Sequence, residues 1–300
     1  MNPAAPTAPA KPVNEAWTVR GILEWTTKFL AEKGSENPRV DAEVLMSHAW
    51  GCDRILLYTR FREEAPEAVR TKMRSLVQRR AASEPVAYLV GHKEFFSLKF
   101  AVDKNVLVPR PETEFLAALA LDELKLRGAE PTLCDLGTGS GCLAVTIAKH
   151  AANAHVVAVD VSEAAAAIAT ANAARHDVAD RVDVLVGDLF APLDGRRFDL
   201  IVSNPPYVRD SERAELAADV RDHEPAVALF GGADGLDVTR RLVADAPRHL
   251  VPGGWIGLEL DPSQMKAVSD LLQSAGFDRV QTHRDAAGRE RVITAALSTG

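Results

Sequence analysis

The sequence predicts an α/β protein in which an open parallel sheet with helices on both faces follows a small N-terminal helical domain. Strand and helix patterns alternate from residue 132 onward, which is typical of such a sheet. Residues 17–82 instead repeat apolar side chains every three or four positions, the spacing of helices. The formal net charge is +2 over residues 1–90 and −9 over residues 91–300, so the two parts differ chemically.

Composition excludes several classes of protein. Of the 300 residues, 47% are apolar and 26% are charged, a balance that indicates one large globular domain or two domains. No apolar run approaches the roughly 20 residues of a membrane-spanning helix, and no secretory signal is present, so we expect a cytoplasmic protein that does not bind membranes. The three cysteines form no CxxC pair, which predicts neither a disulfide scaffold nor a metal site. The net charge of −7 disfavours stable binding of nucleic acid.

The N-terminal third is expected to contain a tail and a helical domain. Residues 1–14 are rich in Ala and Pro, which predicts a disordered tail. Residues 15–88 form the predicted helical domain, with apolar faces around Leu23, Leu45 and Leu76. The basic residues between 70 and 80 are most simply a solvated face, and the alternative is a docking surface for a ribonucleoprotein or protein partner.

A bridging hairpin or linker is expected over residues 89–111, which alternate in polarity and are rich in Phe and Val. Pro111 and Glu112 begin a helix that Gly128 ends. Strands are then predicted at residues 132–136, 155–160, 182–186, 198–202 and 255–260, helices at 143–150, 163–175, 238–249 and 264–275, and two late strands at 279–282 and 291–297. Ligands of such sheets bind beyond the carboxyl ends of the strands, so the informative residues should follow strands.

A glycine-rich loop follows the first of these strands. It consists of Gly137, Thr138, Gly139, Ser140 and Gly141, and it opens a helix, so its backbone can approach a ligand closely. Cys142 occupies the place where the dinucleotide fingerprint requires Gly or Ala. Asp135, two residues before the loop, favours a cationic ligand over a pyrophosphate. S-adenosylmethionine is such a ligand, because it carries an amino group and a sulfonium but no phosphate. The alternative is a plain strand-to-helix turn.

Two further acids follow the next strands. Asp160 lies 19 residues after Gly141, where a carboxylate accepts hydrogen bonds from ribose hydroxyls of either NAD or S-adenosylmethionine. Asp188 is placed to accept a hydrogen bond from an adenine amino group, with Leu189 packed on the ring. The alternative for Asp188 is a turn or helix-capping aspartate.

The strongest signal is the tetrapeptide Asn204, Pro205, Pro206 and Tyr207, directly after the strand at 198–202. Its two prolines fix the backbone and remove two donors, which leaves the carbonyls of Asn204 and Pro205 as acceptors. The Asn204 side chain adds an acceptor, and Tyr207 adds a flat face. This set suits a planar amino group conjugated to a carbonyl or a ring, a poor nucleophile that needs positioning and electrostatic help. The alternative is a Pro-rich turn.

With these motifs the chain resembles the HemK/PrmC family of protein glutamine N5-methyltransferases over about residues 17–297. The glycine loop and the tetrapeptide carry the general resemblance. Family-specific motifs extend it: Asp41-Ala42-Glu43, Glu84-Pro85-Val86-Ala87-Tyr88, the PRPETE segment at residues 109–114, Glu224-Pro225, Gly231-Gly232, Asp234-Gly235-Leu236 and Arg284-Asp285. His223 and the pair Asp261-Pro262 depart from the family pattern, and both lie outside the loop and the tetrapeptide.

The resemblance implies a class I, Rossmann-like S-adenosylmethionine-dependent methyltransferase sheet. Residues 112–300 would be its catalytic domain and residues 15–88 a substrate-docking domain. The implied substrates are class I peptide chain release factors, methylated on the glutamine of a Gly-Gly-Gln motif, and the implied cofactor is S-adenosyl-L-methionine. Residues 137–141, Asp160, Asp188, Leu189 and Asn204 would contact the cofactor, residues 204–207 would bind the glutamine amide, and Arg110 and Glu112 would lie beside the site. We expect a monomer without a metal.

Other functions stay open at this stage. Methylation of adenine N6 or cytosine N4 uses similarly conjugated amines, but it requires base flipping and a basic groove, which the acidic second part disfavours. Glutamine methylation of a ribosomal protein is a second alternative, which the PRPETE segment disfavours. A binding module on a retained fold is a third, and the intact motifs count against it. A nicotinamide oxidoreductase is a fourth, and the loop spacing counts against it.

Overall fold

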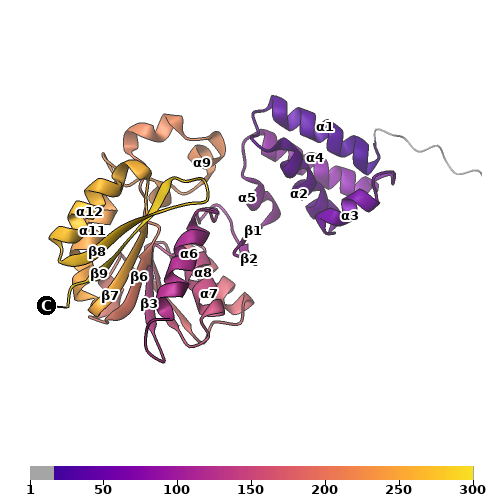
Figure 1. The fold of residues 1–300 in the computed structure, drawn as a ribbon. Coiled ribbons are helices and arrows are strands. Elements are labelled where there is room, and N and C mark those ends of the chain that lie inside the picture. Colours follow the sequence, from indigo (N-terminus) through magenta and orange to yellow (C-terminus); the bar gives the residue numbers. More distant parts are fainter. Residues whose placement is uncertain (1–16, 300) are drawn as a thin grey trace, which may run out of the picture. The chain divides into compact units, whose positions relative to one another are not determined.

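The computed structural model describes residues 17–299, so the tail predicted at residues 1–14 lies outside the described residues. The chain divides into two compact units, one ending at Val90 and one beginning at Gly91 (Figure 1). The hairpin expected in the linker over residues 89–111 therefore belongs to the second unit. Among the described residues, no helix is long and apolar enough to cross a membrane.

Within the described residues the first unit consists of helices and one isolated β-bridge between Thr18 and Glu64. Its helices are α1 (Val19–Glu32), α2 (Pro38–Trp50), α3 (Arg54–Thr59), α4 (Glu67–Ala81) and α5 (Val86–Val90). Thr18 caps α1 by accepting a hydrogen bond from the backbone N–H of Gly21, and Gly51 ends α2 in the left-handed conformation. Leu23, Leu45 and Leu76 lie in one buried apolar cluster, as their spacing predicts.

Acidic side chains of α2 join the helices of this unit. Asp41 accepts a hydrogen bond from Arg80 of α4 at 2.8 Å. The buried Glu43 accepts from Arg54 at 2.7 Å and from Tyr58 at 2.6 Å, both on α3. Burial raises the pKa of Glu43, but its hydrogen bonds with Arg54, Tyr58 and Arg39 and the charge of Arg39 together lower it by more, so the net shift is downward. Arg80, one of the basic residues of α4, thus forms an ion pair with Asp41 within the unit.

The second unit contains a seven-stranded sheet in the order β5-β4-β3-β6-β7-β9-β8 and a separate hairpin. The sheet strands are β3 (Thr132–Leu136), β4 (His155–Asp160), β5 (Val182–Val186), β6 (Phe198–Ser203), β7 (Leu250–Glu259), β8 (Phe277–Arg284) and β9 (Glu290–Leu297), and the hairpin is β1 (His92–Phe95) with β2 (Leu98–Ala101). Strands β3 to β7 pair in parallel, as the alternation of strands and helices predicts.

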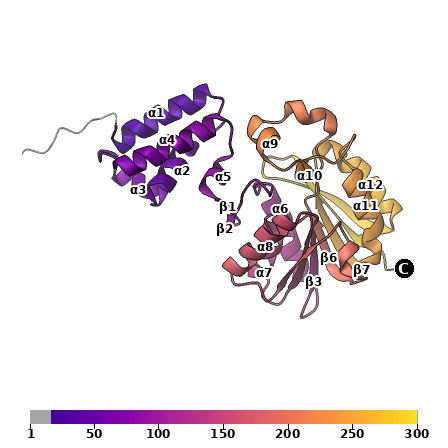
Figure 2. The ribbon, with the colours of Figure 1, turned by 180° about the vertical axis from the view of Figure 1, so that it is seen from behind.

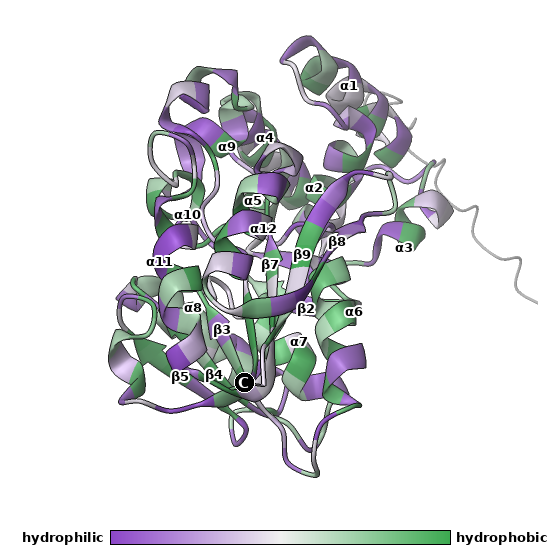
Figure 3. Cartoon of the chain, turned by 60° about the vertical axis from the view of Figure 1, so that its left-hand side comes forward, coloured by the Kyte–Doolittle hydropathy of each residue, from purple (hydrophilic) through white to green (hydrophobic). Residues whose placement is uncertain are grey.

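The sequence analysis predicted no direction for the two late strands, and they depart from the parallel arrangement of the others. β9 is antiparallel to β7 and to β8. Only residues 285–289 separate β8 from β9, and so short a connection can join antiparallel strands but cannot cross over to a parallel one. β8 forms the sheet edge and carries mostly hydrophilic residues, coloured purple in Figure 3.

Helices cover both faces of the sheet (Figures 1 and 2). The first face packs on α6 (Thr113–Leu124), α7 (Cys142–His150) and α8 (Glu163–Arg175), and the second on α11 (Asp237–Asp245) and α12 (Met265–Ser274). Alternate strand residues supply the two cores, so that Leu133 lies in the first and Cys134 in the second.

Short elements lie between the main ones. They are the short 3₁₀ helices η2 (Ala191–Leu193), η3 (Asp210–Glu215), η4 (Ala246–Arg248) and η5 (Pro262–Gln264), with α9 (Ala218–His223) and α10 (Ala226–Leu229). The sequence analysis assigned no element to residues 210–229, because these runs are too short to show a helical period.

Candidate active site

The glycine loop has the geometry of a ligand-binding turn. Gly137, Gly139 and Gly141 have φ angles of +73°, +57° and +78°, a region that other residues rarely adopt. A Cβ at Gly137 or Gly139 would meet nothing within 4 Å, whereas a Cβ at Gly141 would lie 3.0 Å from Cβ of Ala169 on α8. The first two glycines therefore border open space, and the third lets α7 pack closely on α8.

Asp160, at the end of β4, holds this loop. One carboxylate oxygen accepts a hydrogen bond from the N–H of Gly139 at 2.8 Å, and the other accepts from the N–H of Ser162 at 2.9 Å. Each oxygen has a further lone pair that can accept from a ligand hydroxyl. The structure thus places the expected ribose-binding acid directly against the loop.

Asn172, which the sequence analysis did not single out, supports the loop from α8. Its buried side chain donates to the carbonyl of Ser140 at 2.8 Å and to the carbonyl of Ala101 at 3.0 Å, and it accepts from the N–H of Ala101 at 2.8 Å. One asparagine therefore joins the hairpin strand β2 to the glycine loop. Its partners lie 71 and 32 residues away in the sequence, so no local pattern marks it.

Asp135 is a buried acid under the loop. One oxygen accepts from the hydroxyl of Thr138 at 2.6 Å and from the N–H of Ala144 at 3.2 Å, and the other has no partner among the described residues. Burial, with a smaller effect from the charge of Asp160, raises the pKa of Asp135 to about 7. A positive charge bound nearby would favour the ionised carboxylate.

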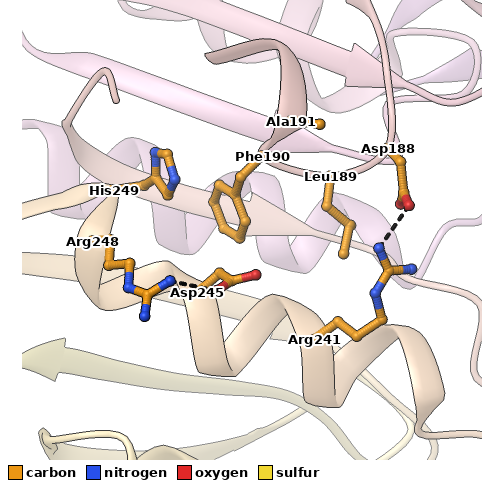
Figure 4. A pocket seen from close by; sticks show the side chains of 8 residues that line it. All are labelled: Asp188, Leu189, Phe190, Ala191, Arg241, Asp245, Arg248 and His249. Atoms are coloured by element: carbon orange, nitrogen blue, oxygen red, sulfur yellow. Dashed lines mark hydrogen bonds and ion pairs between the residues drawn. The ribbon is translucent and has the colours of Figure 1, made fainter. Parts of the chain in front are cut away.

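A surface hollow of about 340 Å³ lies beside the loop that follows β5 (Figure 4). Asp188 and Leu189 are at one end of it, and the rings of Phe190 and His249 stack 4.5 Å apart at the other. Asp188 accepts a hydrogen bond from Arg241 of α11 at 2.6 Å, and both side chains are about half exposed. An adenine amino group at Asp188 would therefore share the carboxylate with Arg241.

The tetrapeptide lies at the end of β6, which pairs with β3 so that Ser203 is opposite Leu136. The hydroxyl of Ser203 donates to the carbonyl of Leu136 at 2.6 Å and joins the two strand ends. Nδ2 of Asn204 donates to Oγ1 of Thr113 at 3.2 Å. No donor among the described residues contacts Oδ1 of Asn204, so this oxygen can accept a hydrogen bond from a ligand.

The loop at residues 231–235 packs against the backbone of Pro206 and Tyr207, the last two residues of the tetrapeptide. A Cβ on Gly231 would lie 2.4 Å from the carbonyl oxygen of Pro206, and a Cβ on Gly235 would lie 2.2 Å from that of Tyr207. The buried Gln264 donates to the Tyr207 carbonyl at 2.9 Å. Burial raises the pKa of the Tyr207 hydroxyl to about 12, so this side chain is neutral.

The PRPETE segment is held to the region after the tetrapeptide. Arg110 donates to both oxygens of Glu224 at 2.8 Å, and the Glu224 side chain is only 2% exposed. Burial raises the pKa of Glu224 more than the Arg110 charge lowers it. Glu112 lies 3.6 Å from Arg289, which follows β8. The two residues expected beside the site are thus engaged in ion pairs.

A second buried acid ends β7, the strand that pairs with β6. Glu259, the last residue of β7, is 1% exposed, and its Oε2 has no hydrogen-bond partner among the described residues. Burial raises the pKa of Glu259 to about 7. The sequence analysis missed both Thr113 and Glu259 as site residues, although Thr113 lies in the PRPETE segment. Across the described residues, no group of three or more His, Cys, Asp or Glu side chains could hold a metal ion.

Asp135 should make stability depend on pH. The folded chain keeps the proton of Asp135 up to about pH 7, whereas the unfolded chain releases it near pH 3.9. The free energy of unfolding should therefore fall as pH rises between these values, by up to about 1.4 kcal/mol per pH unit from this group. We predict that Asp135→Asn flattens this fall in urea unfolding measured from pH 4 to pH 8. Equal slopes in the two proteins would contradict the raised pKa.

Comparison with known proteins gives two family matches. Residues 21–91 match the PrmC N-terminal domain, and residues 112–221 match the methyltransferase small domain. The chain is 46% identical to the release factor glutamine methyltransferase of Rhodopirellula baltica over 284 residues, covering 93% of this chain and 96% of the relative. It is 44% identical to the protein of the same name from Geobacter sulfurreducens, covering 93% and 96%.

Solved structures share the fold at lower identity. A methyltransferase from Pyrococcus furiosus has a TM-score of 0.52 and 21% identity, covering 76% of this chain and 99% of its own. The hMettl16 catalytic domain, solved with the MAT2A 3′UTR hairpin 6, has a TM-score of 0.56 and 16% identity, covering 75% and 82%. These similarities show a class I methyltransferase fold. With the identities above, they establish that the chain belongs to the family of release factor glutamine methyltransferases.

Proposed function

We propose that this chain transfers a methyl group from S-adenosyl-L-methionine to the side-chain amide nitrogen of the Gly-Gly-Gln glutamine in class I peptide chain release factors. The names of its relatives support this substrate. The observation that carries the chemistry is the free Oδ1 of Asn204 at the strand end next to the glycine loop. A site for an amide should present acceptors, and this one does.

The residues around the glycine loop fit the cofactor. The space in front of Gly137 and Gly139 is open, so a ligand can lie directly against the backbone. The unpartnered oxygen of Asp135 suits a ligand with positive charge. Asp160 can accept from ribose hydroxyls while it holds Gly139. When bound, S-adenosylmethionine supplies an electrophilic methyl group on a sulfonium.

The tetrapeptide would hold the glutamine amide by its two hydrogens. An amide nitrogen is a weak nucleophile because its lone pair is delocalised into the carbonyl. Oδ1 of Asn204 and the carbonyl of Pro205 would each accept one N–H, which fixes the nitrogen towards the methyl donor. Positioning and preorganised acceptors of this kind can supply much of a rate enhancement without a charged base.

The transfer of the methyl group needs no further reactant. The amide nitrogen forms a bond to the methyl carbon as the carbon–sulfur bond breaks, and the bonding pair stays on sulfur. The nitrogen then loses one of its protons to solvent. Tyr207 stays neutral throughout, because burial raises its pKa to about 12.

We also propose that the helical unit docks the protein substrate. Several of its large side chains are exposed and could contact a protein substrate, with Trp25 60%, Ile55 70% and Tyr58 47% exposed. If it docks the substrate, an intact release factor should have a lower KM than an isolated Gly-Gly-Gln peptide. Equal kcat/KM values for protein and peptide would contradict the docking role.

The direct test is methyl transfer from labelled S-adenosylmethionine to a purified release factor, followed by peptide mass mapping. We expect one methyl group on the Gly-Gly-Gln glutamine. It should be absent when that glutamine is replaced by Ala, and the rate should fall at least 100-fold in Asn204→Ala because one acceptor is lost. Cofactor binding without transfer to the release factor would refute the proposed substrate.

Gly231 offers a test of the support under the tetrapeptide. A Cβ at this position would require the carbonyl of Pro206 to move, and displacements of about 1 Å can cost 100-fold in rate. We predict that Gly231→Ala lowers kcat about 100-fold. Gly128→Ala is the matched control, because a Cβ there meets nothing within 4 Å, and it should keep wild-type activity. Equal activity of the two variants would show that the close approach is not needed.

A further inference from the structure

We infer that Asn172 is a positioning residue that couples the binding of S-adenosylmethionine on the glycine loop to the hairpin of β1 and β2. The inference rests on the cofactor of the proposed function and extends its site to a side chain of α8. The hairpin then takes part in cofactor binding, although no residue of β1 or β2 lies in the predicted cofactor site.

The side-chain amide of Asn172 uses both of its donor hydrogens and its oxygen. Nδ2 donates to the carbonyl of Ser140 at 2.8 Å and to the carbonyl of Ala101 at 3.0 Å, and Oδ1 accepts from the N–H of Ala101 at 2.8 Å. The side chain is fully buried, so water does not compete for these bonds. A flipped amide would oppose a donor to the Ala101 N–H and an acceptor to two carbonyls, so the bonds hold the amide in one orientation.

The bond to Ser140 fixes one peptide group of the glycine loop. The carbonyl of Ser140 and the N–H of Gly141 belong to the same peptide, and this N–H donates to the carbonyl of Thr138 at 2.9 Å. Asn172 and Thr138 thus hold the two ends of that peptide. Gly141 has a φ of +78°, and glycine adopts positive and negative φ with similar ease, so without Asn172 this peptide could rotate and reshape the loop.

A fixed loop favours ligand binding, because less conformational entropy is lost when the ligand binds. Gly137 and Gly139 border the open space in which the cofactor would lie, and Ser140 follows directly after them. The fully buried Asn172 acts on cofactor affinity through this loop.

The same side chain holds the hairpin. Ala101, the last residue of β2, bonds to Asn172 with both its N–H and its carbonyl, and α8 packs against β2. Near the turn of the hairpin, the N–H of Phe96 donates to Glu114 of the PRPETE segment at 2.8 Å. The hairpin is therefore attached to the glycine loop through Asn172 and to the start of α6 through Glu114.

Coupling between two sites acts in both directions. If the contacts of Asn172 stabilise the loop conformation that binds the cofactor, the bound cofactor must stabilise those contacts in turn. The amide hydrogen of Ala101 reports on them, because its acceptor is Oδ1 of Asn172. Its exchange with solvent should therefore respond to a ligand that lies on the glycine loop.

The first test compares Asn172→Ala with Val268→Ala. Both substitutions remove buried atoms from a helix and lower stability, but Val268 lies on α12 in the core of the second face. By isothermal titration calorimetry we expect Asn172→Ala to raise the Kd of S-adenosylhomocysteine about tenfold, the worth of roughly one hydrogen bond. Val268→Ala should keep the wild-type Kd. Equal Kd values in the two variants would overturn the inference in favour of a packing role.

Hydrogen exchange in the wild-type chain gives a second readout that needs neither activity nor a variant. Saturating S-adenosylhomocysteine should slow exchange of the Ala101 amide at least about fivefold more than that of the β9 amides. β9 is the comparison because two strands separate it from β3. Equal slowing at both places would overturn the coupling, whether or not Asn172→Ala folds.

The amide of Gly141 separates this inference from the proposed function. In the free chain its exchange should be at least about tenfold faster in Asn172→Ala than in Val268→Ala, because its peptide group has lost one of its two bonds. Equal exchange in the two variants would overturn the positioning role. If Gly141 responds but the wild-type chain does not bind S-adenosylhomocysteine, the proposed cofactor fails and the hold of Asn172 on the loop stands.

Discussion

The parallel pairing of β3 with β6 is the constraint on which the site depends. It places Leu136 opposite Ser203, and the Ser203 hydroxyl joins the two strand ends by a hydrogen bond to the Leu136 carbonyl. The glycine loop leaves the first strand and the Asn-Pro-Pro-Tyr segment leaves the second. A methyl donor on the loop and an amino group on the tetrapeptide would therefore meet without any large movement of the backbone.

The groups expected to bind the substrate are neutral, and the charged side chains near them are buried or paired with each other. Asn204 and Pro205 offer oxygen atoms that can accept hydrogen bonds, while Arg110 and Glu224 pair with each other. Asp135 and Glu259 are buried acids with pKa values raised to about 7. This arrangement suits an uncharged amide, which needs a fixed orientation more than a strong base.

The sequence predicts the parts of the fold and the site that depend on local patterns. The five parallel strands, the glycine loop and the tetrapeptide all appear as short runs of residues, and the structure brings the loop and the tetrapeptide to adjacent strands. The antiparallel pairing of β8 and β9 was missed because strand direction follows from the length of a connection. Asn172 and Gln264 were missed because the carbonyls to which their side chains donate lie between 30 and 71 residues away, where no local pattern reaches.

The central claim is that two acceptors of the tetrapeptide hold the glutamine amide. Its most direct test is a crystal structure of the chain with S-adenosylhomocysteine and a Gly-Gly-Gln peptide. We expect the glutamine side-chain nitrogen within about 3.2 Å of both Oδ1 of Asn204 and the carbonyl oxygen of Pro205. A glutamine bound away from the tetrapeptide, or one that faces the NH₂ end of Asn204, would contradict the claim.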